Sequence, residues 1–250
     1  PNVILSKDLF IPEGETAPLK YNFFAFSDDD QKLLLFTHTK RVWRLNTKGN
    51  YWVLDRQKGT LKQLGRSLPP SSLMFAKFSP DGNYVAYVCE NNIYVEDLAN
   101  SQIRALTTDG TVTLINGTFD WAYEEEFFCR DGFRWSPDSR HIAYWQFDSE
   151  GVGTFYLINN TDSTYPELTP LPYPKVGTTN SACRVGVIPA DGGETTWFEP
   201  EGDPRGFYIP MMGWAAGAEE IWLVRLNRLQ NTAEIMLGEI STGRLSTVFT

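Results

Sequence analysis

The sequence has few of the residues that build disulfide frameworks and metal centres, and it has no long apolar run. Its 250 residues include three cysteines and two histidines. Cys89, Cys129 and Cys183 are odd in number and far apart, so they form neither a disulfide framework nor the ligand spacing of a zinc site. No apolar run approaches the roughly 18 residues that a membrane-spanning helix needs. We therefore expect no metal, no cofactor and no membrane span in this chain.

Positive charge is also scarce. The chain has 22 Lys and Arg against 31 Asp and Glu, for a net charge of −9, and its basic residues form no cluster. A nucleic-acid surface needs a basic patch, so we expect no nucleic-acid partner. The chain begins at Pro1 with neither an initiator methionine nor a signal peptide, and we expect it to be part of a longer protein.

Aromatic residues are abundant, at 14% of the chain, which favours sheets over helical bundles. One pattern recurs: an aromatic residue, a serine, a turn rich in Asp, Pro or Gly, and a short apolar strand. Its copies are FSDDDQKLLLF from Phe26, FSPDGNYVAYV from Phe78, WSPDSRHIAYW from Trp135 and a weaker GWAAGAEEIWLV from Gly213. Further strands and turns follow within about 50 residues, which is the pattern of a propeller blade. We predict a single all-β domain over 1–250, a partial β-propeller of about four antiparallel meander blades.

The repeats are unequally spaced, which locates two insertions. One spans 111–134 and carries a short helical acidic segment, and the other contains the proline-rich stretch 165–177. Proline lacks the N–H that a central strand must donate, so we interpret the second insertion as an extended arm that projects from a blade. The alternative is a mobile surface loop. Insertions are where repeat scaffolds usually carry function.

The acidic insertion contains Asp-Trp-Ala-Tyr-Glu-Glu-Glu at 120–126. Three adjacent carboxylates repel one another, and the large aromatic residues around them, such as Trp121 and Phe127, would hold part of the run away from water. Like charges in that setting are costly unless a cation joins them, so the run is suited to binding a positively charged group. The alternative is a solvated acidic patch on a short helix.

Together, DWAYEEEF, the following WSPDSRHIAYWQF, and YPELTPLPYPKVGTTN resemble the dipeptidyl peptidase IV family of serine exopeptidases. The resemblance covers nearly the whole chain and corresponds to the central part of that family's N-terminal β-propeller. It implies an eight-bladed propeller that caps an α/β-hydrolase domain, with the substrate held in a cavity between them. It also implies release of dipeptides from a free N-terminus, with Pro or Ala favoured as the second residue.

The resemblance further implies which residues bind substrate. The second and third Glu of the motif, Glu125 and Glu126, would hold the substrate's ammonium group, and Glu124 would have a structural role. Arg44, in the match Val-Trp-Arg at 42–44, would contact a backbone carbonyl of the substrate. Because Arg44 has several basic neighbours, it could instead be one of several solvated charges.

Residue chemistry agrees with this assignment of the Glu pair. A free α-amine is cationic below its pKa of about 8. Two carboxylates offer acceptors for its three N–H donors, and each charge-assisted bond contributes roughly 1.5–3 kcal/mol. An enzyme that anchors the amine at a fixed distance from its nucleophile selects the scissile bond by length alone.

The catalytic machinery is missing from the sequence. A serine hydrolase of this fold needs Gly-x-Ser-x-Gly with Asp and His later in the chain, and no such motif occurs. We expect this chain alone to be inactive, with the α/β-hydrolase domain elsewhere in the parent protein. The resemblance also implies a homodimer formed through the arm at 165–174, and a periplasmic, secreted or membrane-anchored location.

Two other functions stay open at this stage. The family includes relatives that have lost the nucleophile and act as interaction partners, so the chain could be a non-catalytic propeller. Retention of both Glu125 and Glu126 argues against this, because a protein that only binds partners has no need to hold an amine. A glycosidase is a third reading, but it needs two carboxylates roughly 5–9.5 Å apart across a sugar, and sequence neighbours suit this poorly.

Overall fold

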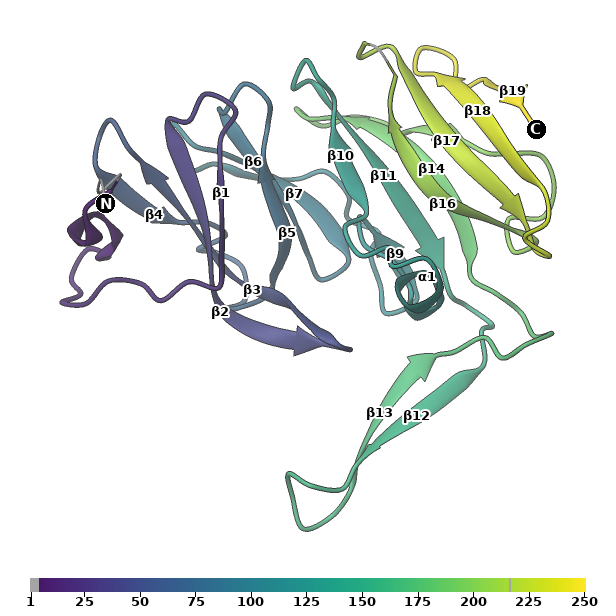
Figure 1. Ribbon diagram of the computed structural model, residues 1–250, viewed down its shortest axis with the longest axis horizontal. Coiled ribbons are helices and arrows are strands. Elements are labelled where there is room, and N and C mark those ends of the chain that lie inside the picture. Colours follow the sequence, from purple (N-terminus) through teal and green to yellow (C-terminus); the bar gives the residue numbers. More distant parts are fainter. Residues whose placement is uncertain (1–4, 216) are drawn as a thin grey trace. The chain divides into compact units, whose positions relative to one another are not determined.

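The computed structural model describes residues 5–215 and 217–250 and consists mostly of antiparallel strands (Figure 1). The chain divides into two compact units. The first is Pro1–Thr108 with Ala190–Gly192, and the second is Asp109–Pro189 with Gly193–Thr250. Each unit has its own sheets and its own buried cluster. That the two act as one domain stays a prediction.

The first unit holds two four-stranded antiparallel meanders. Their strands are β1 (Phe23–Phe26), β2 (Lys32–Val42), β3 (Leu45–Asp55), β4 (Thr60–Gln63), β5 (Leu73–Phe78), β6 (Tyr84–Cys89), β7 (Asn92–Asp97) and β8 (Ile103–Ala105). Pairing of β3 with β5, with Gly49 opposite Leu73, joins both meanders into one eight-stranded sheet. A short 3₁₀ helix, η1 (Lys7–Phe10), contacts β4.

The second unit holds two further meanders and one short helix. The elements in chain order are β9 (Leu114–Asn116), α1 (Trp121–Glu126), β10 (Phe133–Trp135), β11 (His141–Asp148), β14 (Ala182–Pro189), β15 (Thr196–Phe198), β16 (Phe207–Trp214), β17 (Glu220–Asn227), β18 (Ala233–Glu239) and β19 (Leu245–Phe249). Strands β10, β11, β14 and β15 form one meander, β9 pairs with β11, and β16 to β19 form the other. The four meanders follow the four sequence repeats. Their membership in an eight-bladed ring stays a prediction.

The turns of the first three repeats share one hydrogen-bond pattern. In each, a serine hydroxyl donates to the aspartate two residues later: Ser27 to Asp29 at 2.6 Å, Ser79 to Asp81 at 2.5 Å and Ser136 to Asp138 at 2.6 Å. The same hydroxyl accepts from the backbone N–H five residues on, at 2.9, 3.0 and 2.9 Å. These bonds satisfy backbone donors at the start of the second strand, which is why the pattern predicts a turn between two strands.

The core of the second unit joins its two meanders. Strand β11 is buried over six consecutive residues, so both of its faces are covered. Trp145, on β11, is 1% exposed, and its Nε1 donates to the carbonyl of Ile209 on β16 at 2.8 Å. The indole therefore fills the space between the meanders and satisfies its own donor, as a buried tryptophan must.

The predicted arm is a β-hairpin of β12 (Thr154–Asn159) and β13 (Glu167–Pro172), seen below α1 in Figure 1. It starts at Thr154, so the expected range 165–177 covers only its second strand and the segment that follows. Pro170 and Pro172 lie two residues apart on β13, opposite Tyr156 and Thr154. Because β13 has β12 as its neighbour on one side only, both missing N–H groups can face the open edge.

Candidate functional site

Helix α1 carries the acidic run and begins at a buried cap. Asp120 is 6% exposed; its Oδ1 accepts from the backbone N–H of Tyr123 at 2.9 Å, and its Oδ2 accepts from the hydroxyl of Ser181 at 2.6 Å. Burial raises the pKa of Asp120, while the bonds from Ser181 and Tyr123 act in the opposite direction. The cap therefore starts the helix and also ties it to the residue just before β14.

Tyr123 fixes the underside of the helix. Its ring is 3% exposed and packs edge-on against Phe147, with ring centroids 4.6 Å apart. Its hydroxyl oxygen accepts from the backbone N–H of Ile209 at 2.9 Å. Burial raises the pKa of Tyr123, so the phenol stays neutral. The motif's tyrosine thus anchors α1 to β16 and has no free surface for a ligand.

The three glutamates of α1 have different surroundings. Glu124 is 7% exposed, and its Oε1 accepts from Arg130 Nε at 3.1 Å. Burial raises the pKa of Glu124, and the Arg130 guanidinium opposes this rise. Glu125 is half-buried and Glu126 is exposed. Glu124 therefore forms an internal ion pair. Glu125 and Glu126 lie nearer the surface, where they can contact a ligand.

The first residue of α1 contacts the base of the arm. Trp121 packs against Tyr173 with ring centroids 4.1 Å apart and an angle of 33° between the ring planes. Tyr173 follows β13 directly, and its ring also packs against Phe155 of β12 at 5.4 Å. Two insertions that are far apart in the sequence thus meet beside the acidic run.

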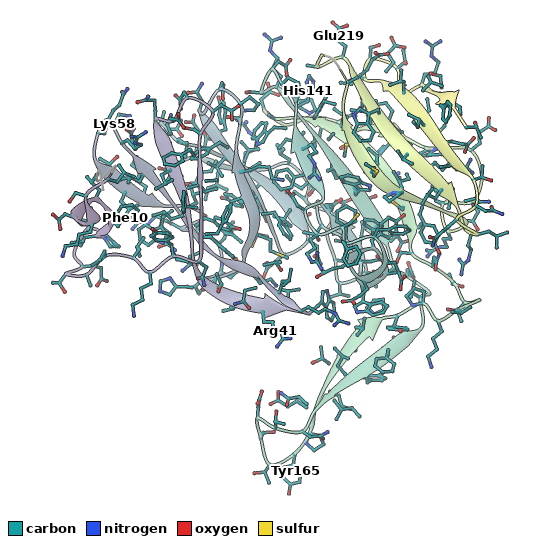
Figure 2. All side chains as sticks on the ribbon, in the orientation of Figure 1. Phe10, Arg41, Lys58, His141, Tyr165 and Glu219 are labelled. Carbon is teal, nitrogen blue, oxygen red and sulfur yellow. The ribbon has the colours of Figure 1, made fainter. Side chains whose placement is uncertain are left out.

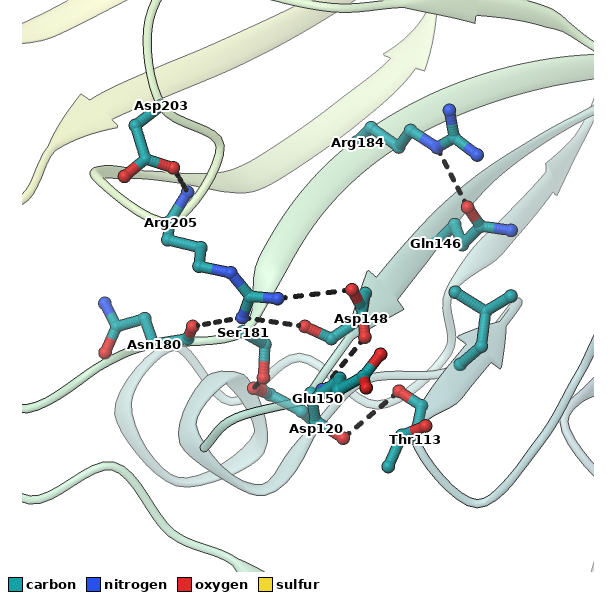
Figure 3. A network of polar contacts seen from close by, with 12 residues as sticks. Thr113, Asp120, Gln146, Asp148, Glu150, Asn180, Ser181, Arg184, Asp203 and Arg205 are labelled. Carbon is teal, nitrogen blue, oxygen red and sulfur yellow. Dashed lines mark hydrogen bonds and ion pairs between the residues drawn. The ribbon is translucent and has the colours of Figure 1, made fainter. Parts of the chain in front are cut away.

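A polar network holds the segment that returns from the arm (Figure 3). The Arg205 guanidinium donates to the carbonyl of Asn180 at 2.8 Å and to the carboxylate of Asp148 at 3.2 Å. Since Asp148 ends β11 and Asn180 immediately precedes Ser181, Arg205 joins the strand before the arm to the segment after it. This segment then receives the helix cap at Asp120.

Arg44 lies at the tip of the long β2–β3 hairpin and is exposed; the nearby Arg41 is labelled in Figure 2. Trp43 beside it has a φ of 51°, and its carbonyl accepts from Arg41 Nε at 2.9 Å, which shapes the turn. Arg44 belongs to the first unit, whereas Glu125 and Glu126 belong to the second. The structure brings the two glutamates together on one helix but does not place Arg44 with them.

Sequence reasoning missed the residues that support the helix. Arg130, Tyr173 and Ser181 each contact the acidic segment, yet none of them was predicted. A basic residue shortly after the acidic run was a usable signal for Arg130. Nothing local pointed to Tyr173 or Ser181, because their partners lie about fifty to sixty residues away along the chain.

Other ligand classes have little support in the residues that the structure describes. Over 5–215 and 217–250, no group of three or more His, Cys, Asp or Glu side chains could hold a metal ion. The three cysteines are free, with Cys89 and Cys183 buried. None of the described helices has the length and apolarity needed to cross a membrane.

The chain belongs to the family described as the dipeptidyl peptidase IV (DPP IV) N-terminal region, whose model matches residues 27–250. It is 34% identical over 204 residues to dipeptidyl aminopeptidase B of Saccharomyces cerevisiae, covering 80% of this chain and 24% of that protein. It is 27% identical over 246 residues to dipeptidyl peptidase 4 of Trichophyton rubrum, covering 94% of this chain and 31% of that protein.

A solved structure shows the same fold. The crystal structure of Porphyromonas gingivalis dipeptidyl peptidase 4 matches 96% of this chain with a TM-score of 0.87 and 27% sequence identity. The match covers 33% of that chain. The present chain therefore spans about a quarter to a third of the length of these relatives, within their N-terminal region.

Proposed function

We propose that this chain is the substrate-recognition region of a dipeptidyl peptidase IV-like serine exopeptidase that releases N-terminal Xaa-Pro and Xaa-Ala dipeptides. In this proposal, Glu125 and Glu126 hold the free N-terminal ammonium group of the peptide. Membership in the family and relatives named dipeptidyl peptidases support the class of activity.

The observation that carries the proposal is the difference in burial among the three adjacent carboxylates of α1. Glu124 is buried and paired with Arg130, so it cannot serve a ligand without breaking an internal ion pair. Glu125 and Glu126 lie farther out on the same helix. Two acceptor groups on one rigidly capped turn match the three N–H donors of an ammonium ion, and such charge-assisted bonds are worth roughly 1.5–3 kcal/mol each.

Arg44 would orient the same peptide by donating to a backbone carbonyl. Strands of a meander alternate in direction, so the β2–β3 tip and the connection that enters a following meander lie at the same end of their blades. Arg44 occupies the first kind of position and α1 the second. This placement within each meander supports the proposal that Arg44, Glu125 and Glu126 contact the same peptide.

The bond cleavage would be performed by another part of the parent protein. The chain has no Gly-x-Ser-x-Gly motif, and it corresponds to a fraction of each relative's length. An α/β-hydrolase domain in the same parent chain would supply the nucleophile and most of the pocket for the second residue. This chain by itself would bind peptide without cleaving it.

The arm is our candidate for a homodimer contact. Its hairpin exposes large apolar side chains on both strands, which are Phe155, Tyr156, Leu157, Ile158 and Leu168, with Tyr165 at the tip 82% exposed (Figure 2). A concentration of exposed apolar surface of this kind favours burial against a partner. A second copy of the parent protein is the partner proposed, through residues near 165–174 and the opposing strand.

A comparison of two substrates tests the proposal. The full-length parent protein is assayed with a Gly-Pro chromogenic substrate that is either free or N-acetylated. Acetylation removes the positive charge, so we expect a loss of at least about 10²-fold in kcat/KM, equivalent to about 2.7 kcal/mol. Equal cleavage of both substrates would refute amine anchoring. No cleavage of either would favour a non-catalytic interaction protein of the same family.

A further inference from the structure

The aromatic bridge of Trp121, Tyr173 and Phe155 connects the arm to the helix of the Glu pair. Its two contacts have ring centroids 4.1 Å and 5.4 Å apart. Tyr173 is the central member, and its backbone N–H donates to the carbonyl of Gly153 at 2.8 Å, which closes the base of the hairpin. The backbone of Tyr173, whose ring supports Trp121, is therefore fixed where the two strands of the arm begin and end.

The segment that returns from the arm touches the start of α1 twice. Tyr173 contacts Trp121, and Ser181 donates to Asp120 at 2.6 Å. A helix of six residues is too short to hold its own conformation or direction in water. Its orientation must come from such tertiary contacts, and these two act at the end where the helix begins.

Trp121 and the Glu pair are coupled by helix geometry. Glu125 follows Trp121 by four residues, so both lie on the same face of α1, one turn apart. A change in the packing of the Trp121 ring would therefore tilt this face of α1 and displace Glu125 together with its neighbour. Glu124 and Tyr123 contact other parts of the unit, through Arg130 and Ile209, while Trp121 contacts the base of the arm.

We propose that Tyr173 is a positioning residue for the amine anchor, acting through Trp121 to set where Glu125 and Glu126 meet the peptide's ammonium group. This inference rests on the proposed function. The ring performs the role, because Tyr173 contacts Trp121 through its ring. Since the ammonium stays bound in the ground state and in the transition state alike, weaker anchoring raises KM and leaves kcat unchanged.

The test uses the full-length parent protein and the free Gly-Pro chromogenic substrate. Tyr173→Ala removes the ring, Tyr173→Phe keeps it, and Tyr165→Ala makes the same truncation at the exposed tip of the same arm. KM and kcat are measured for each variant, and light scattering reports the oligomeric state at the assay concentration. If Tyr173→Ala fails to fold, Trp121→Phe weakens the same ring contact by a smaller amount.

We expect Tyr173→Ala to raise KM by about three- to tenfold, the range set by one aromatic pair, with kcat within about twofold. Tyr173→Phe should stay within about twofold of the wild type in both constants, and Tyr165→Ala should raise KM less than Tyr173→Ala does. Trp121→Phe should fall between wild type and Tyr173→Ala. The kcat/KM for the N-acetylated substrate, which has no ammonium to anchor, should not respond to any of these changes.

Three results would overturn the inference. Tyr173→Ala with an unchanged KM would show that the ring positions nothing. If Tyr165→Ala raises KM as much as Tyr173→Ala does, the increase in KM is due to the arm as a whole. If KM rises only when an oligomer dissociates, the increase is due to loss of assembly. If the wild type cleaves free and acetylated substrate equally, the proposed function itself has failed. If the wild type discriminates and Tyr173→Ala keeps its KM, only the positioning role is lost.

Discussion

The ion pair between Glu124 of the acidic run and Arg130 should contribute to the stability of the fold and to its pH dependence. In Arg130→Ala, the carboxylate of Glu124 keeps its buried position and loses the guanidinium 3.1 Å away. Breaking a fully buried pair costs about 3–5 kcal/mol. The side chains here are 9% and 24% exposed, so water compensates in part. We expect a loss of about 2 kcal/mol near neutral pH, closer to the value of one charge-assisted bond.

The loss should shrink in acid. Burial raises the folded-state pKa of Glu124 above its unfolded value, and removal of Arg130 raises it further. A raised carboxyl pKa means that the ionised form costs stability above that pKa, and the cost disappears as the pH falls through it. The difference between wild type and Arg130→Ala should therefore be largest near neutral pH and should shrink as the pH falls through the raised pKa of Glu124, because a protonated Glu124 no longer needs a cation.

Thermal unfolding followed by tryptophan fluorescence measures this effect. A loss of about 2 kcal/mol corresponds to a fall in Tm of about 4–8 °C for a domain of this size. Arg140→Ala, at an exposed position in a turn of the same unit, is the matched control. The double variant Glu124→Gln with Arg130→Ala should recover part of the loss, because no charge is then left unpaired. A Tm equal to that of Arg140→Ala, or a difference that does not change with pH, would refute the reasoning.

Three further changes test other parts of the account. Ser181→Ala removes the 2.6 Å bond to buried Asp120 and should cost about 1–3 kcal/mol of unfolding free energy, measured by denaturant titration. Gly132→Ala places a Cβ 2.7 Å from a backbone carbon and should lower Tm and soluble yield by overpacking, whereas Gly153→Ala, with its nearest atom at 3.9 Å, should not. Arg44→Ala should raise KM for Gly-Pro substrates about tenfold if the side chain binds a substrate carbonyl, and an unchanged KM would mark Arg44 as a solvated charge.

The blades were predictable because their signal is local. The turn from Ser136 to His141 is fixed by bonds between residues within five positions of each other, so its sequence alone indicates two strands and a turn. Strands β14 and β15 were not predicted, since no copy of the repeat marks them. The arm was placed by its prolines, but its first strand, β12, lacks them and was missed.

The Glu pair is predicted from the resemblance alone, since most runs of three glutamates are solvated helix faces. The structure adds what the sequence could not show, which is that Glu124 is buried against Arg130. The contacts of Tyr173 and Ser181 with α1 depend on how the arm folds back, and no local pattern encodes such long-range packing. The placement of Arg44 relative to the pair stays a prediction.

The most direct test of the central claim combines one substitution with one change in the substrate. Glu126→Gln removes the negative charge of a proposed ligand for the ammonium group while keeping the size of the side chain. Glu150→Gln, at an exposed position in the same unit, is the matched control. Each protein is assayed in full-length form with free and N-acetylated Gly-Pro substrate. Amine anchoring predicts that Glu126→Gln lowers kcat/KM by about 10²-fold on the free substrate, the value of about 2.7 kcal/mol, and by less than about threefold on the acetylated one. Equal losses on both substrates would contradict the account, because the carboxylate would then act on something other than the ammonium group.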